Sequence, residues 1–353
     1  MASDTKTPLQ RIVDVLKLGE PSQYRDHTYI NGESMYFPTG RVYGGQVISQ
    51  SLIAASKTVP EDRLPHSIHG YFIAPGDIHQ DLLFDVENLR DGHSFSARRV
   101  NVTQSQGSIL TAIASFQTKD QPGVEYFDPM PADVPDPESL PSSVDLMKPY
   151  ADQSDYAKYY ATTSPFDIRY ISSPIVLGPD EESHRLDTGK QMLWMRAMGE
   201  IEVSQTFHRA LLALGCDQVM LEPILRRAGL TLLTPGISFA SIDHSMWWYR
   251  RDEVASVCAG HADCRPWPRA VFGKGVLPGG RSRGVHGAGG DDSRPADRLT
   301  LCRIVCLSVS RESTDVSVDM PTNCRASPTC RSHRPRYCRH DALRPASASQ
   351  TPC

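Results

Sequence analysis

Residues 66–117 alternate between apolar and polar side chains with a period of two, and this alternation limits the possible folds more than any other feature. One side of the pattern ends in the set Leu110, Ala112, Ala114 and Phe116. A period of two is typical of strands that bury one face against a core. Because turn-forming residues cluster at 75–77 and 90–92, the stretch divides into successive strands of an antiparallel sheet.

Helices precede these strands. Gly44 and Gly45 interrupt a short apolar stretch, and one helical face then follows, made of Val47, Ile48, Leu52 and Ala55. A shorter helix is predicted at residues 7–18, where Thr7 suits the N-cap and Pro8 suits the first turn. Helices followed by a run of antiparallel strands are typical of the α+β class.

The same order of elements occurs a second time along the chain. The pattern predicts a strand at 191–199, a helix at 203–216 and another strand at 234–249. Such a recurrence indicates an internal structural repeat. Between the two units, five prolines fall within residues 129–141, which predicts an extended, solvated linker.

Charge and cysteine content change near residue 250. The residues before this point carry 21 basic and 31 acidic side chains, whereas the residues after it carry 16 basic and 10 acidic ones. Eight of the nine cysteines also lie in this last part. We therefore expect four parts, namely a first unit at 1–118, a linker at 119–164, a second unit at 165–250 and a tail at 251–353.

The front part, residues 1–250, excludes several classes of protein. Its one cysteine, Cys216, is typical of a reduced, intracellular compartment. Its acidic balance gives no electrostatic reason to expect nucleic acid as a partner. No apolar run approaches the roughly 18 residues of a membrane span, and the N-terminus lacks the basic and apolar regions of a secretory signal.

Several long segments of the front part carry a family resemblance. In order, they are RVYGGQVISQSLIAA, PHSIHGYFIAPGD, DVENLRDGHSFSARRV and PGISFASIDHSMWW. Together they resemble the acyl-CoA thioesterase II family over residues 8–250. The resemblance implies a double hotdog, in which two long helices are each wrapped by an antiparallel sheet and the sheets join side by side. It also implies hydrolysis of fatty acyl-CoA to free fatty acid and CoA, in fatty-acid metabolism and without a cofactor.

The resemblance further implies a site that activates water with an Asp, a Thr or Ser, and a Gln. Asp217 matches the Asp and Ser241 matches the Thr or Ser. A carboxylate can take a proton from water as a general base. A hydroxyl can orient the water and polarise the thioester carbonyl. Because water attacks directly, no acyl-enzyme is needed.

Five further residues are secondary candidates for supporting the substrate or the site. Asp243 and His244 look like a catalytic dyad, but the resemblance favours a structural pair at the junction of the two sheets. Gly44, Gly45 and Gln46 are expected to shape the start of the first long helix rather than to touch substrate.

A metal site is not expected. His66 and His69 have no carboxylate or cysteine partner at metal-ligand spacing, so packing or hydrogen bonding is the simpler role for both. Cys216 is expected in the core. The tail cysteines show no C-x2-C pair, which disfavours a zinc site there.

The family pattern is lost after Arg250. The family continues with further strands and ends near a Gln-Glu-Gly segment, whereas the tail is dense in Gly, Pro and Arg. Composition alone predicts a disordered basic tail. However, codons that start one base later at Val254 can encode a long family-like string that ends in SMAQEGMIR, with the Gln encoded across Ala288 and Gly289. We therefore hypothesise that residues from about 251 onward are an out-of-frame translation.

This hypothesis has a physical consequence for the second unit. Without the last two or three strands of its sheet, the second hotdog is incomplete and keeps an open edge. Apolar side chains would then be partly exposed, namely Leu211, Leu212, Phe239 and Trp247. We expect such a chain to be unstable or to aggregate, with little hydrolase activity.

Other functions stay open at this point. A chain without the Gln would be a catalytically impaired remnant that binds acyl-CoA or dimerises, and a hotdog hydratase acting on enoyl-CoA is a third class. The arginine-rich end could bind nucleic acid non-specifically, although wrong-frame GC-rich codons also give arginine. The expected partner is acyl-CoA, with a homo-oligomer left open. The expected location is the peroxisome or the cytoplasm, and residues 351–353 are not a peroxisomal tripeptide.

Overall fold

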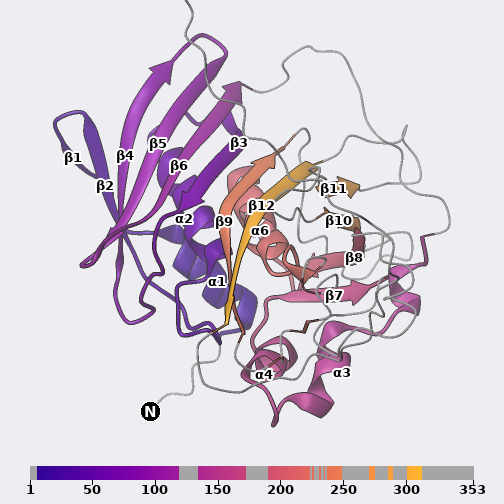
Figure 1. Ribbon diagram of the computed structural model, residues 1–353. Coiled ribbons are helices and arrows are strands. Elements are labelled where there is room, and N and C mark those ends of the chain that lie inside the picture. Colours follow the sequence, from indigo (N-terminus) through magenta and orange to yellow (C-terminus); the bar gives the residue numbers. More distant parts are fainter. Residues whose placement is uncertain are drawn as a thin grey trace, which may run out of the picture. The chain divides into compact units, whose positions relative to one another are not determined.

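The structure is a computed structural model, and its described residues form one antiparallel sheet of twelve strands with long helices on one face (Figure 1). All of them lie in one compact unit, Met1–Ser313. No helix in this part of the chain is long and apolar enough to cross a membrane. The described residues are 6–118, 134–171, 190–222, 225, 230–231, 234, 237–248, 270–274, 285–288 and 300–311.

Helix α1 (Pro8–Lys17) lies where the capping pattern predicted it. The Thr7 side chain accepts a hydrogen bond from the Gln10 backbone N–H, and the Gln10 side chain accepts one from the Thr7 backbone N–H. This capping box satisfies two backbone N–H groups that the first turn would otherwise leave unpaired. The apolar stripe of the helix faces the core through Leu9, Ile12 and Leu16.

Helix α2 (Gly44–Ser56) starts at the glycine pair, after β1 (Ser22–Tyr24) and β2 (His27–Gly32). The sequence predicted one buried face, but residues 45–55 are buried on every side. The reason is that the sheet covers one side of the helix and a second long helix covers the other. The polar side chains of the predicted outer face therefore bond inside the protein, as Ser49 does to the Ala210 carbonyl at 2.7 Å.

The alternating stretch forms the four strands that follow α2. They are β3 (Arg63–Phe72), β4 (Leu82–Asp91), β5 (Phe95–Gln104) and β6 (Gly107–Thr118). In the sheet, the first half has the order β1-β2-β4-β5-β6-β3. Alternate residues of β4 point into the core, where Leu82, Phe84 and Val86 are fully buried. The predicted antiparallel sheet is confirmed.

The expectation of an extended linker over 119–164 does not hold for residues 134–164. Short helices lie there: η1 (Pro137–Ser139), α3 (Ser143–Met147), η2 (Lys148–Tyr150) and α4 (Asp155–Thr162). Ser142 and Ser154 cap the two α-helices, and Met147, Tyr159 and Tyr160 are buried. These buried side chains attach the segment to the core. Its prolines and carboxylates had indicated a solvated segment instead. Residues 119–133 lie outside the described residues.

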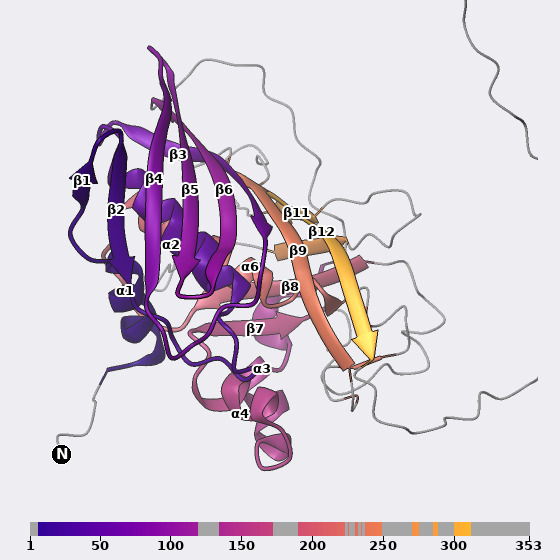
Figure 2. The same cartoon turned by 60° about the vertical axis from the view of Figure 1, so that its left-hand side comes forward.

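The second half repeats the topology of the first. Strand β7 (Phe166–Tyr170) comes first. It is followed by β8 (Lys190–Ala197), α6 (Gln205–Asp217) and β9 (Ile237–Trp247), and these three lie close to their predicted bounds. The order β2-β4-β5-β6-β3 in the first half matches β8-β10-β11-β12-β9 in the second. Strands β3 and β9 pair antiparallel and join the halves into one sheet (Figure 2). The predicted internal repeat is thereby confirmed.

Three strands come from the tail, which differs from the expectation of a segment without regular structure. They are β10 (Ala270–Lys274), β11 (Val285–Ala288) and β12 (Thr300–Arg311). Strand β12 pairs along β9 from Trp247 to Ile237, so the edge of β9 is covered. The remaining residues between 249 and 299, and residues 312–353, lie outside the described part of the chain.

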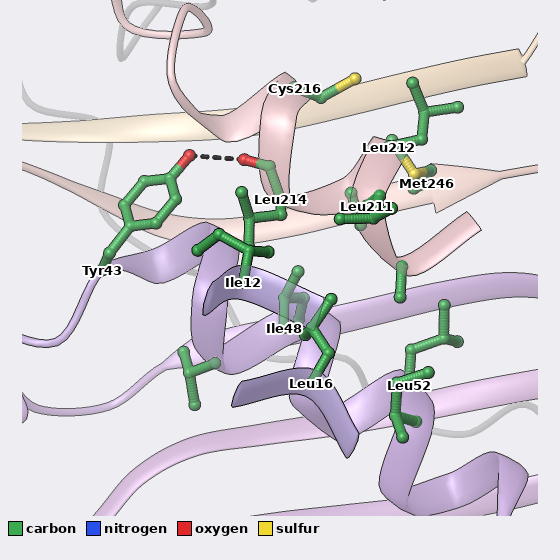
Figure 3. Close-up of a cluster of buried hydrophobic side chains, with 14 of the residues drawn as sticks. Ile12, Leu16, Tyr43, Ile48, Leu52, Leu211, Leu212, Leu214, Cys216 and Met246 are labelled. Carbon is green, nitrogen blue, oxygen red and sulfur yellow. Dashed lines mark hydrogen bonds between the residues drawn. The ribbon is translucent and has the colours of Figure 1, made fainter. Parts of the chain in front are cut away.

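The predicted exposure of the second helix is not observed. Leu211 and Leu212 are 0% and 6% exposed, and Trp247 is half-buried, while the side chain of Phe239 lies outside the described set. The reason is that α6 packs against α2 rather than depending on the tail for cover. Figure 3 shows this shared core, to which α1, α2, α6 and β9 contribute Ile12, Leu16, Ile48, Leu52, Leu211, Leu212, Leu214 and Met246.

Candidate active site

Asp217 is the last residue of α6, and its carboxylate lies against the first residue of α2. A Cβ atom added to Gly44 would come within 2.8 Å of Asp217 Oδ2, so only a glycine allows this approach. The Asp217 side chain is 6% exposed. The two halves of the molecule thus meet at this carboxylate, one supplying the acid and the other a helix N-terminus.

The start of α2 is an electrostatically suitable neighbour for an anion. The first backbone N–H groups of a helix have no partner inside the helix, and they carry a partial positive charge. The N-cap residue, Tyr43, makes no side-chain capping bond. Because Gly44 lacks a side chain, the carboxylate can reach this turn directly.

His244 is the second ionisable group beside Asp217. It lies on β9 and is fully buried, and its Nδ1 is 3.5 Å from Asp217 Oδ1. This separation is longer than an ordinary hydrogen bond. Catalytic hydrogen bonds are often long in a protein without substrate and shorten when substrate binds.

Tyr43 holds the two helices together at this end. Its hydroxyl donates a hydrogen bond of 2.6 Å to the Leu214 carbonyl in the last turn of α6 (Figure 3). Burial raises the pKa of Tyr43 well above its ordinary value, and the nearby Asp217 charge raises it further. The phenol therefore stays protonated and keeps its donor role. Sequence reasoning missed this residue, although an aromatic side chain directly before the glycine pair was a signal for it.

Asp243 and His244 do not form a dyad with each other. Successive residues of a strand point to opposite faces of the sheet. His244 points toward α6 and Asp217, whereas Asp243 pairs on the other face with His69, whose Nε2 is 3.1 Å from Asp243 Oδ2. Both residues do lie at the junction of the halves, because Gly70 of β3 is the cross-strand partner of His244.

Ser241 lies on β9 three residues before His244. Along the regular β9–β12 ladder, alternation puts Ser241 on the face of Asp243 and opposite to His244. Its cross-strand partner on β12 is Leu307, and the serine is half-buried. The structure therefore brings His244, rather than Ser241, to the face that carries Asp217. A shared site of Asp217 and Ser241 stays a prediction.

Gln46 and Gly45 have structural contacts at the start of α2. The Gln46 side chain donates to the Glu33 carbonyl at 3.0 Å and accepts from the Met35 backbone at 3.3 Å, which ties the preceding loop to the helix. The Tyr43 ring occupies the space beside Gly45, where a Cβ would come within 2.6 Å of it. The expected role of these two residues, to shape the start of the helix rather than to touch substrate, stays a prediction.

His66 and Cys216 have packing roles in the structure. His66 meets the Phe95 ring edge-on, and burial lowers the pKa of His66, as does the charge of Arg209. Cys216 is a buried free thiol. Within the described ranges, no cluster of three metal-ligating side chains occurs.

Comparisons with known proteins agree with this architecture. The model of the acyl-CoA thioesterase N-terminal domain matches residues 34–117, and that of acyl-CoA thioesterase matches residues 179–259. The second match runs beyond residue 250, where the sequence pattern had been expected to end. A structure with a hot dog fold from Alicyclobacillus acidocaldarius superposes with a TM-score of 0.57, at 17% identity, and covers 86% of this chain and 99% of its own. That similarity supports the fold alone.

Two relatives of known family share more of the sequence. Acyl-CoA thioesterase 2 of Haemophilus influenzae is 32% identical over 246 residues, which are 69% of this chain and 82% of the relative. Acyl-coenzyme A thioesterase 8 of Homo sapiens is 33% identical over 238 residues, which are 64% of this chain and 70% of the relative. With both halves of the double hotdog in place, this chain belongs to the acyl-CoA thioesterase II family.

Proposed function

We propose that this protein hydrolyses fatty acyl-CoA to a free fatty acid and CoA, with water as the attacking group and no cofactor. The observation that carries the proposal is the buried Asp217 carboxylate at the N-terminus of α2, against Gly44. A carboxylate beside a row of backbone N–H groups offers a proton acceptor and an anion-stabilising surface within one small space. Membership of the thioesterase family supports the same reaction.

The reaction divides into steps that these groups can perform. Asp217 accepts a proton from water while the water oxygen bonds to the thioester carbon. The first N–H groups of α2, at Gly44 and Gly45, stabilise the negative charge that develops on the carbonyl oxygen. The carbon–sulfur bond then breaks, and the departing sulfur of CoA receives the proton from Asp217. Ser241 is proposed to orient the water.

Thiol release is the direct test of this function. Full-length protein is incubated with medium-chain and long-chain acyl-CoA, and the free CoA thiol is detected with a thiol reagent. The wild type is expected to release thiol, and Asp217→Asn is expected to lower kcat about 10²–10⁴-fold, since it removes the general base but keeps the shape. Equal rates for the two proteins, or no release from the wild type, would overturn the proposal.

A second candidate is a catalytically impaired protein that binds acyl-CoA without hydrolysing it. The orientation of Ser241, on the face opposite to His244, favours this candidate. It predicts that a non-hydrolysable acyl-CoA analogue binds in calorimetry while no thiol is released. Loss of enoyl absorbance in the same protein would instead indicate hydration of enoyl-CoA.

The origin of the tail bears on the choice between these candidates. We propose that residues from about 251 onward are translated out of frame, so that the family Gln is missing from this chain. Support comes from the family-like string encoded one base later from Val254. Sequencing the transcript across the codons for Trp248 to Ala255 tests the idea, and an unbroken open frame without an alternative exon would contradict it.

We propose the peroxisome or the cytoplasm as the location. Cys216 is a buried free thiol, which is compatible with either reduced compartment. Expression of a fluorescent fusion and comparison with a peroxisomal marker distinguishes the two. Any self-association is measured on the same protein by light scattering.

A further inference from the structure

We infer that His244 is a positioning residue that fixes the orientation of the Asp217 carboxylate for attack by water. The inference rests on the proposed thioesterase function. Its starting point is that the two carboxylate oxygens have different neighbours. Oδ2 lies against Gly44 at the start of α2, and Oδ1 lies 3.5 Å from Nδ1 of His244. Because the two oxygens of a carboxylate are equivalent, the two contacts together fix the plane of the group, and a quarter-turn of the carboxylate about its own axis would remove both.

Burial strengthens the interaction between His244 and Asp217. His244 is fully buried, and the Asp217 side chain is 6% exposed, so water competes little for either group. Polar groups removed from water are costly unless they interact with one another. An N–H of the imidazole that is directed at Oδ1 leaves Oδ2 as the oxygen nearest the α2 terminus, where the substrate carbonyl is proposed to bind.

The backbone at His244 is itself held in place from both sides. On β3, the residue opposite is Gly70, and on β12 it is Ile304. Gly70 adds no side chain beside the imidazole, and a Cβ there would come within 2.7 Å of Ile48. The imidazole therefore occupies a position that the strand pair defines.

A second histidine–carboxylate pair crosses the same strands on the opposite face. His69 of β3 and Asp243 of β9 approach to 3.1 Å, directly next to the residue that carries the imidazole. The Asp243 side chain is 9% exposed, and that of His69 is 46% exposed. The His69–Asp243 pair joins β3 to β9 where the site needs a fixed backbone. The His244–Asp217 pair joins β9 to α6.

A double-mutant cycle in thiol release tests the role of His244. His244→Ala is expected to lower kcat about 10²-fold with KM little changed, because a misoriented base affects the reaction more than binding. The same change in an Asp217→Asn background is expected to have no further effect, because the base that it positions is gone. His244→Asn is expected to recover most of kcat, since its amide N–H takes the place of the Nδ1–H.

Controls separate positioning from packing. Met246→Ala changes a fully buried side chain on the same face of β9, and it is expected to lower the melting temperature without the loss of kcat. If His244→Ala does not fold, His244→Asn is compared with His244→Gln, whose amide extends to the position of Nε2, and only the former is expected to be active.

The outcomes can be assigned unambiguously. Additive effects of His244→Ala and Asp217→Asn, an equal kcat loss in Met246→Ala, or equal kcat of the Asn and Gln variants would each overturn the positioning role alone. A wild-type chain that releases no thiol would overturn the proposed function, and the positioning role with it. Non-additivity with recovery by Asn supports both.

Discussion

The two halves of the sheet share one strand order but differ in the strands that follow the long helix. In the first half β4, β5 and β6 have 10, 10 and 12 residues, whereas β10, β11 and β12 have 5, 4 and 12. Both long helices are nevertheless buried along most of their length. The comparison teaches that α6 is covered by α2 and the junction strands, so the first half stabilises the half that carries Asp217.

The largest expected effect comes from replacing the tail of the second half with the sequence encoded one base later. A chain whose codons are read one base later from Val254 gains the family-like strands and the Gln. We expect kcat to rise about 10²-fold or more, the effect of one amide donor at a developing charge, together with a higher melting temperature. Thiol release and thermal unfolding of the two full-length forms measure this. Equal activity and stability would show that the present tail already completes the site.

The contact between the halves is tested at Gly44. In Gly44→Ala, the new Cβ would come within 2.8 Å of Asp217 Oδ2 and 3.1 Å of the Phe72 ring. We expect a loss of stability of about 1–3 kcal/mol from overpacking and a fall in kcat of about 10²-fold as the carboxylate moves. Denaturant unfolding and thiol release measure the two effects.

A matched control for Gly44 exists in the other half. Gly215→Ala in α6 would bring a Cβ within 3.1 Å of the Phe166 ring and 2.6 Å of the Met195 sulfur. It therefore overpacks a helix against an aromatic ring without facing Oδ2. A similar loss of stability with a much smaller loss of kcat is expected, and equal losses of kcat would mean that the position of Asp217 is not the cause.

A smaller effect is expected at the hydrogen bond between the helices. Tyr43→Phe removes the bond to the Leu214 carbonyl and leaves a buried acceptor, which costs about 1–3 kcal/mol. Because the pKa of Tyr43 is raised well above its ordinary value, the wild-type bond should persist through about pH 10. Unfolding of both proteins between neutral pH and that value measures this, and a difference that disappears below pH 9 would contradict it.

The smallest effect concerns a carboxylate of the first half. Burial opposes ionisation of Asp91, but hydrogen bonds from Ser96 and Arg98 outweigh it and lower the pKa of this carboxyl. A lowered pKa adds stability above the unfolded value, about 3.9, and this stability is lost as pH falls through the folded value. The difference in melting temperature between wild type and Asp91→Asn should therefore shrink below about pH 4. A difference that grows on acidification would show the opposite sign.

The sequence predicted those parts of the fold that depend on interactions between residues close together in the chain. The Thr7 and Gln10 capping box, the glycine start of α2 and the alternation through Phe116 are of this kind. The short helices around Met147 and Tyr159 were missed because flanking prolines and carboxylates dominate the composition there. Strands β10 to β12 were missed because the tail shows little periodicity.

The site was only partly predictable for a related reason. Asp217 was found through the family motif, but the approach of Gly44 depends on how two distant helices cross. His244 was grouped with Asp243 because they are adjacent in sequence, whereas strand geometry sends adjacent side chains to opposite faces. Sequence proximity is therefore a poor guide to chemical partnership on a strand.

The antiparallel packing of α2 on α6 also bears on stoichiometry. The hydrogen bonds of Tyr43 to Leu214 and of Ser49 to Ala210 show that the two helices run in opposite directions. Each helix has 13 residues. By position along the helix, Ser56 corresponds to Asp217, and Gln205 corresponds to Gly44. The far end of the helix pair thus lacks both the acid and the glycine. The two halves of one chain are related to each other like the subunits of a dimer, but only one end of the helix pair carries the groups of the site. A tightly binding substrate analogue should therefore bind at one equivalent per chain.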